Sequence, residues 1–126
     1  MRADPVIRFA IEFARHSRVG SAQIDLLEAI RKTGSLSQAA RDLRISYRHA
    51  WLLVDGLKPA FQSPLVVAKT GGNGGGGMCL TSLGESLVDS YRALEREFAQ
   101  LAAEGFQSII PKIREPGSRR RPSNGN

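Results

Sequence analysis

Three patterns predict a mainly α domain with a small β component. Residues 34–58 contain two short helical segments joined by a tight turn, residues 65–81 contain two β-type runs around a glycine-rich stretch, and residues 82–104 form one long amphipathic segment. The chain has 126 residues, of which 41% are hydrophobic and 24% charged, as expected for one water-soluble domain with a tail.

The segment before the first helix alternates between apolar and polar residues. Four apolar side chains occupy every second position, which predicts a half-buried strand over residues 6–13: Ile7, Phe9, Ile11 and Phe13. Ser21 is a suitable cap for a helix over residues 22–33, and Thr33-Gly34 is a suitable end for it. The buried stripe of that helix is predicted to contain Ile24, Leu26, Leu27 and Ile30.

Two capping signals define the next pair of helices. Ser35 and Gln38 have the spacing of a capping box, and the short helix that follows should bury Ala39, Ala40 and Leu43. After a tight turn at residues 44–46, Ser46 is a suitable cap for a third helix over residues 47–58, which Pro59 ends. The buried face of this third helix is predicted to contain Ala50, Leu53, Val54 and Leu57.

A glycine-rich hairpin and a long helix complete the pattern. The runs at 65–68 and 78–81 flank the sequence TGGNGGGG, which predicts two strands joined by a long loop. Thr81 or Ser82 can then cap a helix that extends to about residue 104. Its apolar stripe, longer than a small core can cover, contains Leu83, Leu87, Tyr91, Leu94, Phe98 and Leu101.

This order of elements predicts a winged helix-turn-helix with an N-terminal strand, a two-stranded glycine-rich wing and a long C-terminal helix. In such folds the second helix of the pair enters the major groove of DNA and the wing touches the backbone or the minor groove. We expect the domain to span residues 5–104, with a basic, disordered tail over residues 105–126.

The charge distribution agrees with a polyanionic partner. The net charge is +6, and residues 31–69 carry seven basic and two acidic side chains. Many small proteins are basic only because charge keeps them soluble. The prediction of DNA binding therefore depends on the motifs rather than on the charge.

The predicted DNA contacts lie at helix starts and in the wing. Tyr47, Arg48 and His49 are the outward residues of the major-groove helix, and Arg48 suits guanine or phosphate. Trp51 is expected to be buried, with Tyr47 packed on it. The other predicted contacts, mainly to phosphates, are Ser35, Ser37, Gln38, Ser46, Lys69, Gly72, Asn73 and Gly74.

Three segments resemble the ModE family of molybdate-responsive transcriptional regulators. They are GSLSQAARDLRISYRHAW at 34–51, TGGNGGGGMCLTSLG at 70–84 and IDLLEAI at 24–30. The LysR family shares the start of the first segment but not SYRHAW or the glycine wing. The resemblance implies a regulator of molybdate transport or other molybdenum-related genes that binds double-stranded DNA at an inverted-repeat operator.

The resemblance also implies a homodimer formed through the first strand region and the long helix, whose apolar stripe would be the dimer interface. Full regulators of this family carry a C-terminal molybdate-binding region. Because residues after 104 are too few to form that region, we expect no cofactor in this chain and leave molybdate sensing open.

No residue constellation predicts an enzyme. Cys79 is the one cysteine, the histidines His16 and His49 have no nucleophile beside them, and Met78 stands where a phosphate-binding loop needs lysine. We expect no metal site, no membrane span, a cytoplasmic location, and solvated acidic faces at residues 25–28 and 95–97. Three alternatives are a protein-interaction module that pairs with a full-length regulator, a LysR-like DNA-binding fragment, and an oxyanion sensor.

Overall fold

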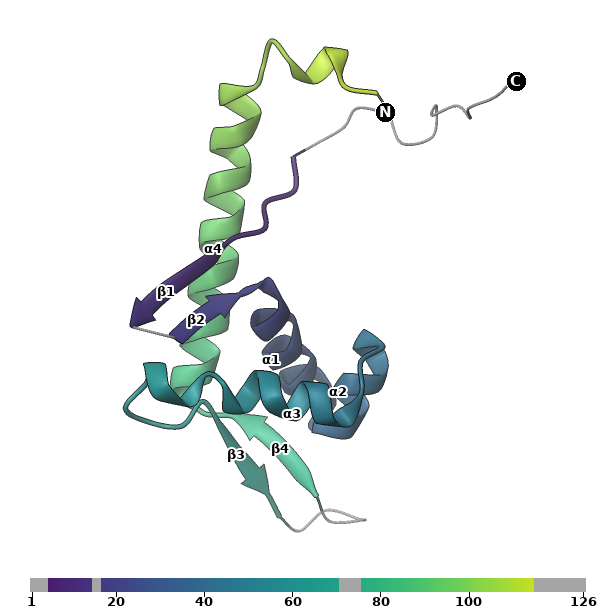
Figure 1. Ribbon diagram of the computed structural model, residues 1–126, viewed down its shortest axis with the longest axis vertical. Coiled ribbons are helices and arrows are strands. Elements are labelled where there is room, and N and C mark those ends of the chain that lie inside the picture. The colour runs from purple at the N-terminus through teal and green to yellow at the C-terminus, as the bar shows by residue number, and fades with distance from the viewer. Residues whose placement is uncertain (1–4, 15–16, 71–75, 115–126) are drawn as a thin grey trace, which may run out of the picture. The chain divides into compact units, whose positions relative to one another are not determined.

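The computed structural model describes residues 5–14, 17–70 and 76–114. The chain divides into two compact units, one of residues 8–93 and one of residues 1–7 with 94–126. The first unit contains the N-terminal hairpin, the helix-turn-helix and the wing (Figure 1). This order of helices and strands confirms the predicted winged helix-turn-helix.

Two antiparallel strands open the first unit, where the sequence predicted one. Strand β1 (Ala10–Ala14) pairs with β2 (Ser17–Gly20), in the register Ile11 opposite Val19. The predicted strand at 6–13 therefore begins too early, and β2 was missed because its four residues include a single large apolar side chain. That side chain, Val19, is fully buried and anchors the hairpin to the core.

Helix α1 (Ser21–Thr33) starts one residue earlier than predicted, because Ser21, the predicted cap, is already its first helical residue. Gly20 is the N-cap, and its own N–H donates to Gln23 Oε1 at 2.9 Å. Gly34 ends the helix in the left-handed conformation, with φ of 75°. The predicted stripe is confirmed, since Ile24, Leu26, Leu27 and Ile30 are all buried.

Helices α2 (Leu36–Leu43) and α3 (Tyr47–Asp55) are both capped by the serines predicted for this role. Ser35 Oγ accepts from Gln38 N–H at 3.1 Å, and Ser46 Oγ accepts from His49 N–H at 2.9 Å. The capping box at α2 is only half formed, because Ser35 N–H donates to Thr33 Oγ1 rather than to Gln38. Ala39 and Ala40 are buried, as predicted.

The turn between α2 and α3 requires an unusual backbone. Arg44 caps α2 at φ of 61°, and it is the one non-glycine residue with positive φ in the described part of the chain. Ile45 N–H then donates to Ala40 O at 3.0 Å, which closes the turn. A side chain with a Cβ pays a conformational cost here of about 1 kcal/mol.

Helix α3 ends three residues before the predicted boundary. Residues 56–57 form a turn, and a 3-10 helix, η1 (Lys58–Ala60), contains Pro59. Proline disfavours α-helical conformation in the residue before it, so the α-helix ends upstream of Lys58. Of the predicted buried face, Ala50 and Leu57 are buried, whereas Leu53 and Val54 are half-buried.

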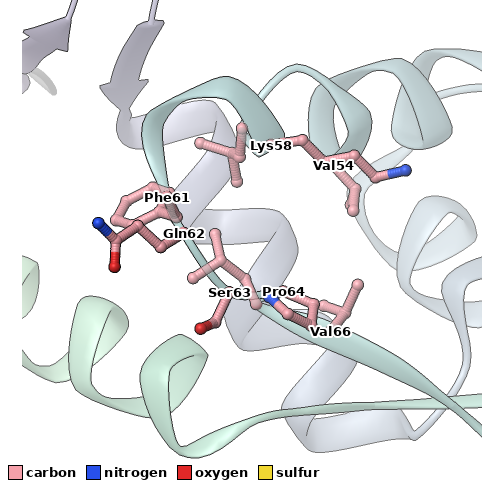
Figure 2. Close-up of a pocket in the computed structure, with 9 residues that line it drawn as sticks. Val54, Lys58, Phe61, Gln62, Ser63, Pro64 and Val66 are labelled. Carbon is pink, nitrogen blue, oxygen red and sulfur yellow. The ribbon is translucent and has the colours of Figure 1, made fainter.

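The segment after η1 borders a pocket of about 240 Å³ between α3 and the wing (Figure 2). Val54 and Lys58 form one side of the pocket, and Phe61, Pro64 and Val66 form the other. The lining is mainly apolar. Lys58 adds a cation at the rim and pairs with Asp55 at 3.1 Å.

The wing consists of β3 (Val66–Lys69) and β4 (Gly77–Leu80), antiparallel with Lys69 opposite Gly77. Figure 1 shows this hairpin projecting beside α3. Its inner strand is tied to the helix-turn-helix, because Met78 N–H donates to Gly34 O at 2.9 Å. The predicted hairpin is confirmed within the described residues; the loop that joins its strands lies largely outside them.

Helix α4 (Ser82–Gly105) begins against the wing. Thr81 Oγ1 accepts from Gly84 N–H at 3.1 Å and donates to Pro64 O at 2.8 Å. Gly84 lies so close to Leu65, the residue before β3, that a Cβ there would be 2.3 Å from Leu65 O. The sequence predicted the cap but not this close approach.

The buried residues of α4 differ from the predicted stripe. Gly84, Val88 and Tyr91 are buried, and the Tyr91 ring stacks on Phe9 with centroids 4.2 Å apart while its hydroxyl donates to Phe9 O. Tyr91, predicted for the dimer interface, therefore contributes to the core of its own unit. The rest of the predicted stripe is half-buried or exposed: Leu83, Leu87, Leu94, Phe98 and Leu101.

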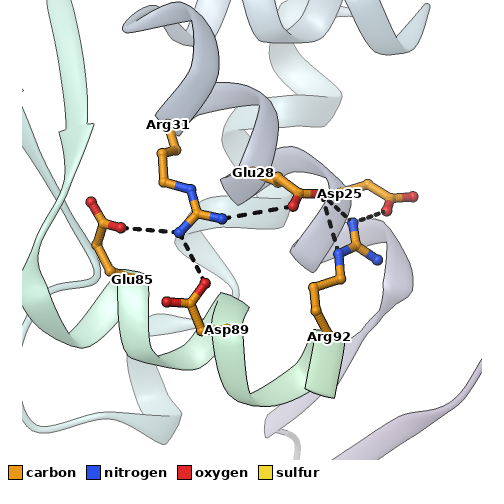
Figure 3. A network of polar contacts seen from close by, with 6 residues as sticks. All are labelled: Asp25, Glu28, Arg31, Glu85, Asp89 and Arg92. Atoms are coloured by element: carbon orange, nitrogen blue, oxygen red, sulfur yellow. Dashed lines mark hydrogen bonds and ion pairs between the residues drawn. The ribbon is translucent and has the colours of Figure 1, made fainter. Parts of the chain in front are cut away.

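A network of charged side chains joins α1 to α4 (Figure 3). Arg31 donates to Glu85 at 3.0 Å and to Asp89 at 3.1 Å, and these hydrogen bonds raise the pKa of its guanidinium. On the neighbouring turn, Arg92 donates to Asp25 at 2.9 Å and to Glu28 at 2.6 Å. The prediction that residues 25–28 form a merely solvated acidic face is thus wrong.

The second unit contains the end of α4 and a short 3-10 helix, η2 (Ile110–Lys112). This 3-10 helix lies within the segment predicted as a tail, of which residues 115–126 are outside the described part. Among the described residues, no helix combines the length and apolar character needed to cross a membrane.

Candidate nucleic-acid interface

The starts of α2 and α3 present hydroxyl groups to solvent. Ser35 and Ser46 accept backbone N–H bonds as caps, which leaves each hydroxyl hydrogen available as a donor. Ser37 and Ser46 are exposed, and Ser35 is half-buried. Hydroxyls beside helix N-termini suit phosphate oxygens, because the amides there carry partial positive charge.

Gln38, another predicted contact, is engaged along the surface of α2. Its Oε1 accepts from Arg41 at 2.8 Å and its Nε2 donates to Asp42 at 2.8 Å. To contact DNA it has to exchange these exposed hydrogen bonds for others. Gln38 is thus less available than the two exposed serines.

The outward face of α3 presents Tyr47, Arg48 and His49, as predicted. All three are exposed, and Tyr47 has 56% of its surface accessible. Within the described part of the chain, the Arg48 guanidinium takes part in no hydrogen bond or ion pair. It is therefore free to donate its forked N–H groups to a base edge or a phosphate.

The prediction for Trp51 is wrong. Its exposed fraction is 47%, and that of the next residue, Leu52, is 48%. Only Ala50 in the short helix α3 is buried, and residue 51 lies about 100° further around the helix axis. Tyr47, predicted to pack on Trp51, leaves nearly half of the Trp51 surface accessible and is itself exposed. Sequence periodicity missed this apolar surface.

The wing contributes one described contact candidate. Lys69 is exposed at the end of β3. The predicted contacts Gly72, Asn73 and Gly74 lie outside the described residues. Beside the wing, Trp51, Val67 and Met78 border a second hollow of about 190 Å³. The sequence predicted neither this hollow nor the pocket at Phe61.

The described residues contain no group of three or more side chains able to hold a metal ion. What they bring together is an exposed helix face with a free arginine, two hydroxyl-capped helix starts and a wing lysine.

Residues 21–85 match the family model described as bacterial regulatory helix-turn-helix protein, lysR family. The chain belongs to this family.

Curated relatives of this lysR-family chain carry molybdenum-related names. It is 40% identical over 93 residues to the molybdenum-pterin-binding protein MopB of Rhodobacter capsulatus, covering 74% of this chain and 34% of that protein. It is 41% identical over 95 residues to the molybdenum transport protein ModE of Azotobacter vinelandii, with coverages of 72% and 35%.

A third relative is the DNA-binding transcriptional dual regulator ModE of Escherichia coli K12, 39% identical over 87 residues, which are 69% of this chain and 32% of that protein. The chain thus spans about a third of the length of these relatives. The predicted resemblance to the ModE family is confirmed. The lysR-family match covers the same region, from α1 through the wing to the start of α4.

Proposed function

We propose that this chain is a dimeric, sequence-specific DNA-binding transcriptional regulator of the ModE type, which acts in the cytoplasm on molybdenum-related genes. The observation that supports it most is the exposed start of α3, where Arg48 has no hydrogen-bond or ion-pair partner among residues 5–14, 17–70 and 76–114 and lies beside Tyr47 and His49. The names of the relatives support the molybdenum connection.

In this proposal α3 lies in the major groove of the operator. Arg48 donates to a guanine edge or a phosphate, and the exposed Ser37 and Ser46 donate to phosphates on either side. Lys69 and the loop at 72–74 contact the neighbouring backbone. A homodimer would present two such surfaces, so the operator should be an inverted repeat with half-sites about 34 Å, or a multiple of that, apart.

The proposed dimer interface uses the exposed members of the α4 stripe. Phe98 and Leu101 have 37% and 62% of their surface accessible, and Leu83 has 37%. Large apolar side chains at helical spacing gain stability when a second helix covers them. Tyr91 is omitted from this interface, because it is buried against Phe9.

The first experiment is selection of fragmented genomic DNA by the purified chain, with sequencing, in the presence and absence of molybdate. Enrichment of one inverted repeat supports the proposal, and a molybdate-dependent change shows that the chain responds to the anion. Uniform recovery of all fragments contradicts sequence-specific binding.

The role of Arg48 is tested on the enriched site. Arg48→Ala should weaken binding by about 1–3 kcal/mol. Arg8→Ala is the matched control, because Arg8 is also exposed but precedes the helix-turn-helix. A loss at Arg48 below about 0.5 kcal/mol, or equal losses for both variants, would exclude Arg48 as a base contact.

The exposed residues Phe98 and Leu101 also favour a second candidate, a protein-interaction module that pairs with a full-length regulator. Salt distinguishes the two. Operator binding should weaken steeply as salt concentration rises, because counterions are released from the phosphates. A complex held by the apolar stripe should be almost insensitive to salt.

A further inference from the structure

The exposed surface of α3 changes character after its first turn. Arg48 and His49 are polar, but the next two exposed side chains, Trp51 and Leu52, are large and apolar, with 47% and 48% of their surface accessible. These two consecutive side chains, about 100° apart around the helix axis, form an apolar patch that follows the polar first turn. Such a patch gains free energy when a partner covers it.

The patch continues directly from the proposed base-contacting residues. Leu52 lies four residues after Arg48, and Trp51 lies four residues after Tyr47, so each pair occupies one side of the helix. Side chains at this spacing have Cβ atoms about 5–6 Å apart. Successive base pairs are separated by about 3.4 Å. When the helix lies in the major groove, the two side chains of one such pair would therefore contact base pairs that are one or two steps apart.

The chemistry of the patch selects one feature of the major groove. Leu52 has no hydrogen-bonding group, and Trp51 has a single N–H donor on a ring that is otherwise apolar, so most of the surface of the two side chains suits an apolar group. The thymine C5-methyl is the apolar group that the major groove displays. Burial of that methyl against leucine or tryptophan removes apolar surface from water on both partners.

We infer that Leu52 and Trp51 recognise thymine methyl groups, so that each half-site carries an A·T pair within one or two base pairs of the one that Arg48 contacts. This inference rests on the proposed function and deepens it, because it names part of the sequence that is recognised. A protein partner that covers the same patch is the competing occupant. It would leave the affinity for DNA independent of thymine methyls.

The test replaces thymine with deoxyuridine in the selected operator, one position at a time. This exchange removes only the methyl group and keeps base pairing and every hydrogen-bonding atom. For the wild-type chain, the dissociation constant should rise about fourfold per methyl at the contacted positions, as expected for one buried apolar carbon. Replacements elsewhere in the operator should leave it unchanged.

Protein variants then connect each methyl to a side chain. Leu52→Ala and Trp51→Ala should each bind the thymine operator more weakly and lose the fourfold discrimination at one position. Both side chains are about half exposed, so the variants should keep the wild-type circular dichroism spectrum. Ile109→Ala is the matched control, since Ile109 is 48% exposed, close to the exposure of Trp51 and Leu52, and lies in no surface proposed to contact DNA or a second copy; it should retain full discrimination.

The outcomes separate this inference from the proposed function. If no operator is selected, the proposed function fails and the inference fails with it. If an operator is selected but deoxyuridine has no effect at any position, only the inference is overturned. Retention of the fourfold discrimination by both alanine variants also overturns it, because another residue then contacts the methyl.

Discussion

Gly84 is the residue of α4 whose replacement should be most informative for stability. A Cβ at this position would lie 2.3 Å from Leu65 O, 3.2 Å from Leu65 C and 3.3 Å from Leu80 Cβ. Cβ contacts shorter than 3.0 Å essentially do not occur. An alanine at this position would therefore force α4 and the segment at Leu65 apart by about 0.7 Å. The atom that is approached is backbone and cannot rotate away.

Two opposing terms set the size of the effect of Gly84→Ala. Alanine in place of glycine inside a helix stabilises by about 1 kcal/mol. Overpacking costs about 1–3 kcal/mol, and the displaced Leu65 carbonyl also accepts from Thr81 N–H at 2.9 Å, a hydrogen bond whose loss adds about 1 kcal/mol. The net expectation is a decrease of about 1–3 kcal/mol in the free energy of unfolding.

The measurement is urea denaturation followed by circular dichroism at 222 nm. Gly105→Ala is the matched control, because Gly105 belongs to the same helix and a Cβ there meets nothing within 4 Å. That variant should be as stable as the wild type or slightly more stable. If Gly84→Ala also proved neutral or stabilising, the close approach of α4 to Leu65 would be refuted.

Two further substitutions test other parts of the fold. Arg92→Leu removes the donor to Asp25 and Glu28 and should lower the free energy of unfolding by about 1–2 kcal/mol. High salt screens ionic interactions, so the difference in stability between wild type and variant should be smaller in 1 M NaCl. An equal difference in both salt conditions would argue against an ionic contribution. Arg44→Gly removes the side chain from a residue whose φ is 61° and so removes the conformational strain of the turn. The free energy of unfolding should rise by about 1 kcal/mol. Unchanged or reduced stability would contradict a strained turn.

The features that the sequence predicted correctly are encoded locally. Ser35, Ser46 and Thr81 each cap the helix that follows, because a capping hydroxyl needs only the backbone three residues further along the chain. The wing strands were also found, since the glycine run separates two short apolar segments. These signals, with the order of the elements, were sufficient for the fold class and for the exposed residues at the start of α3.

The features that were missed depend on contacts between distant segments. The burial of Trp51 was predicted from its spacing, but whether a neighbour covers that side of α3 is decided by where the wing lies. Arg31 and Arg92 meet carboxylates on another helix, up to 67 residues away in sequence. Gly84 is equally unremarkable in the sequence, since only the position of Leu65 reveals why a side chain is excluded there.

The hydrogen bond from Met78 N–H to Gly34 O, 2.9 Å long, has a consequence for binding cooperativity. Gly34 precedes the cap of α2, so a force on the hairpin is transmitted to the residue beside Ser35. We therefore expect the phosphate contacts proposed for Lys69 and for the start of α2 to be energetically coupled. Alanine substitutions at Lys69 and Ser37 should then give losses of DNA affinity that are not additive. Loss of the phosphate contact of the wing would also weaken the phosphate contact at the start of α2.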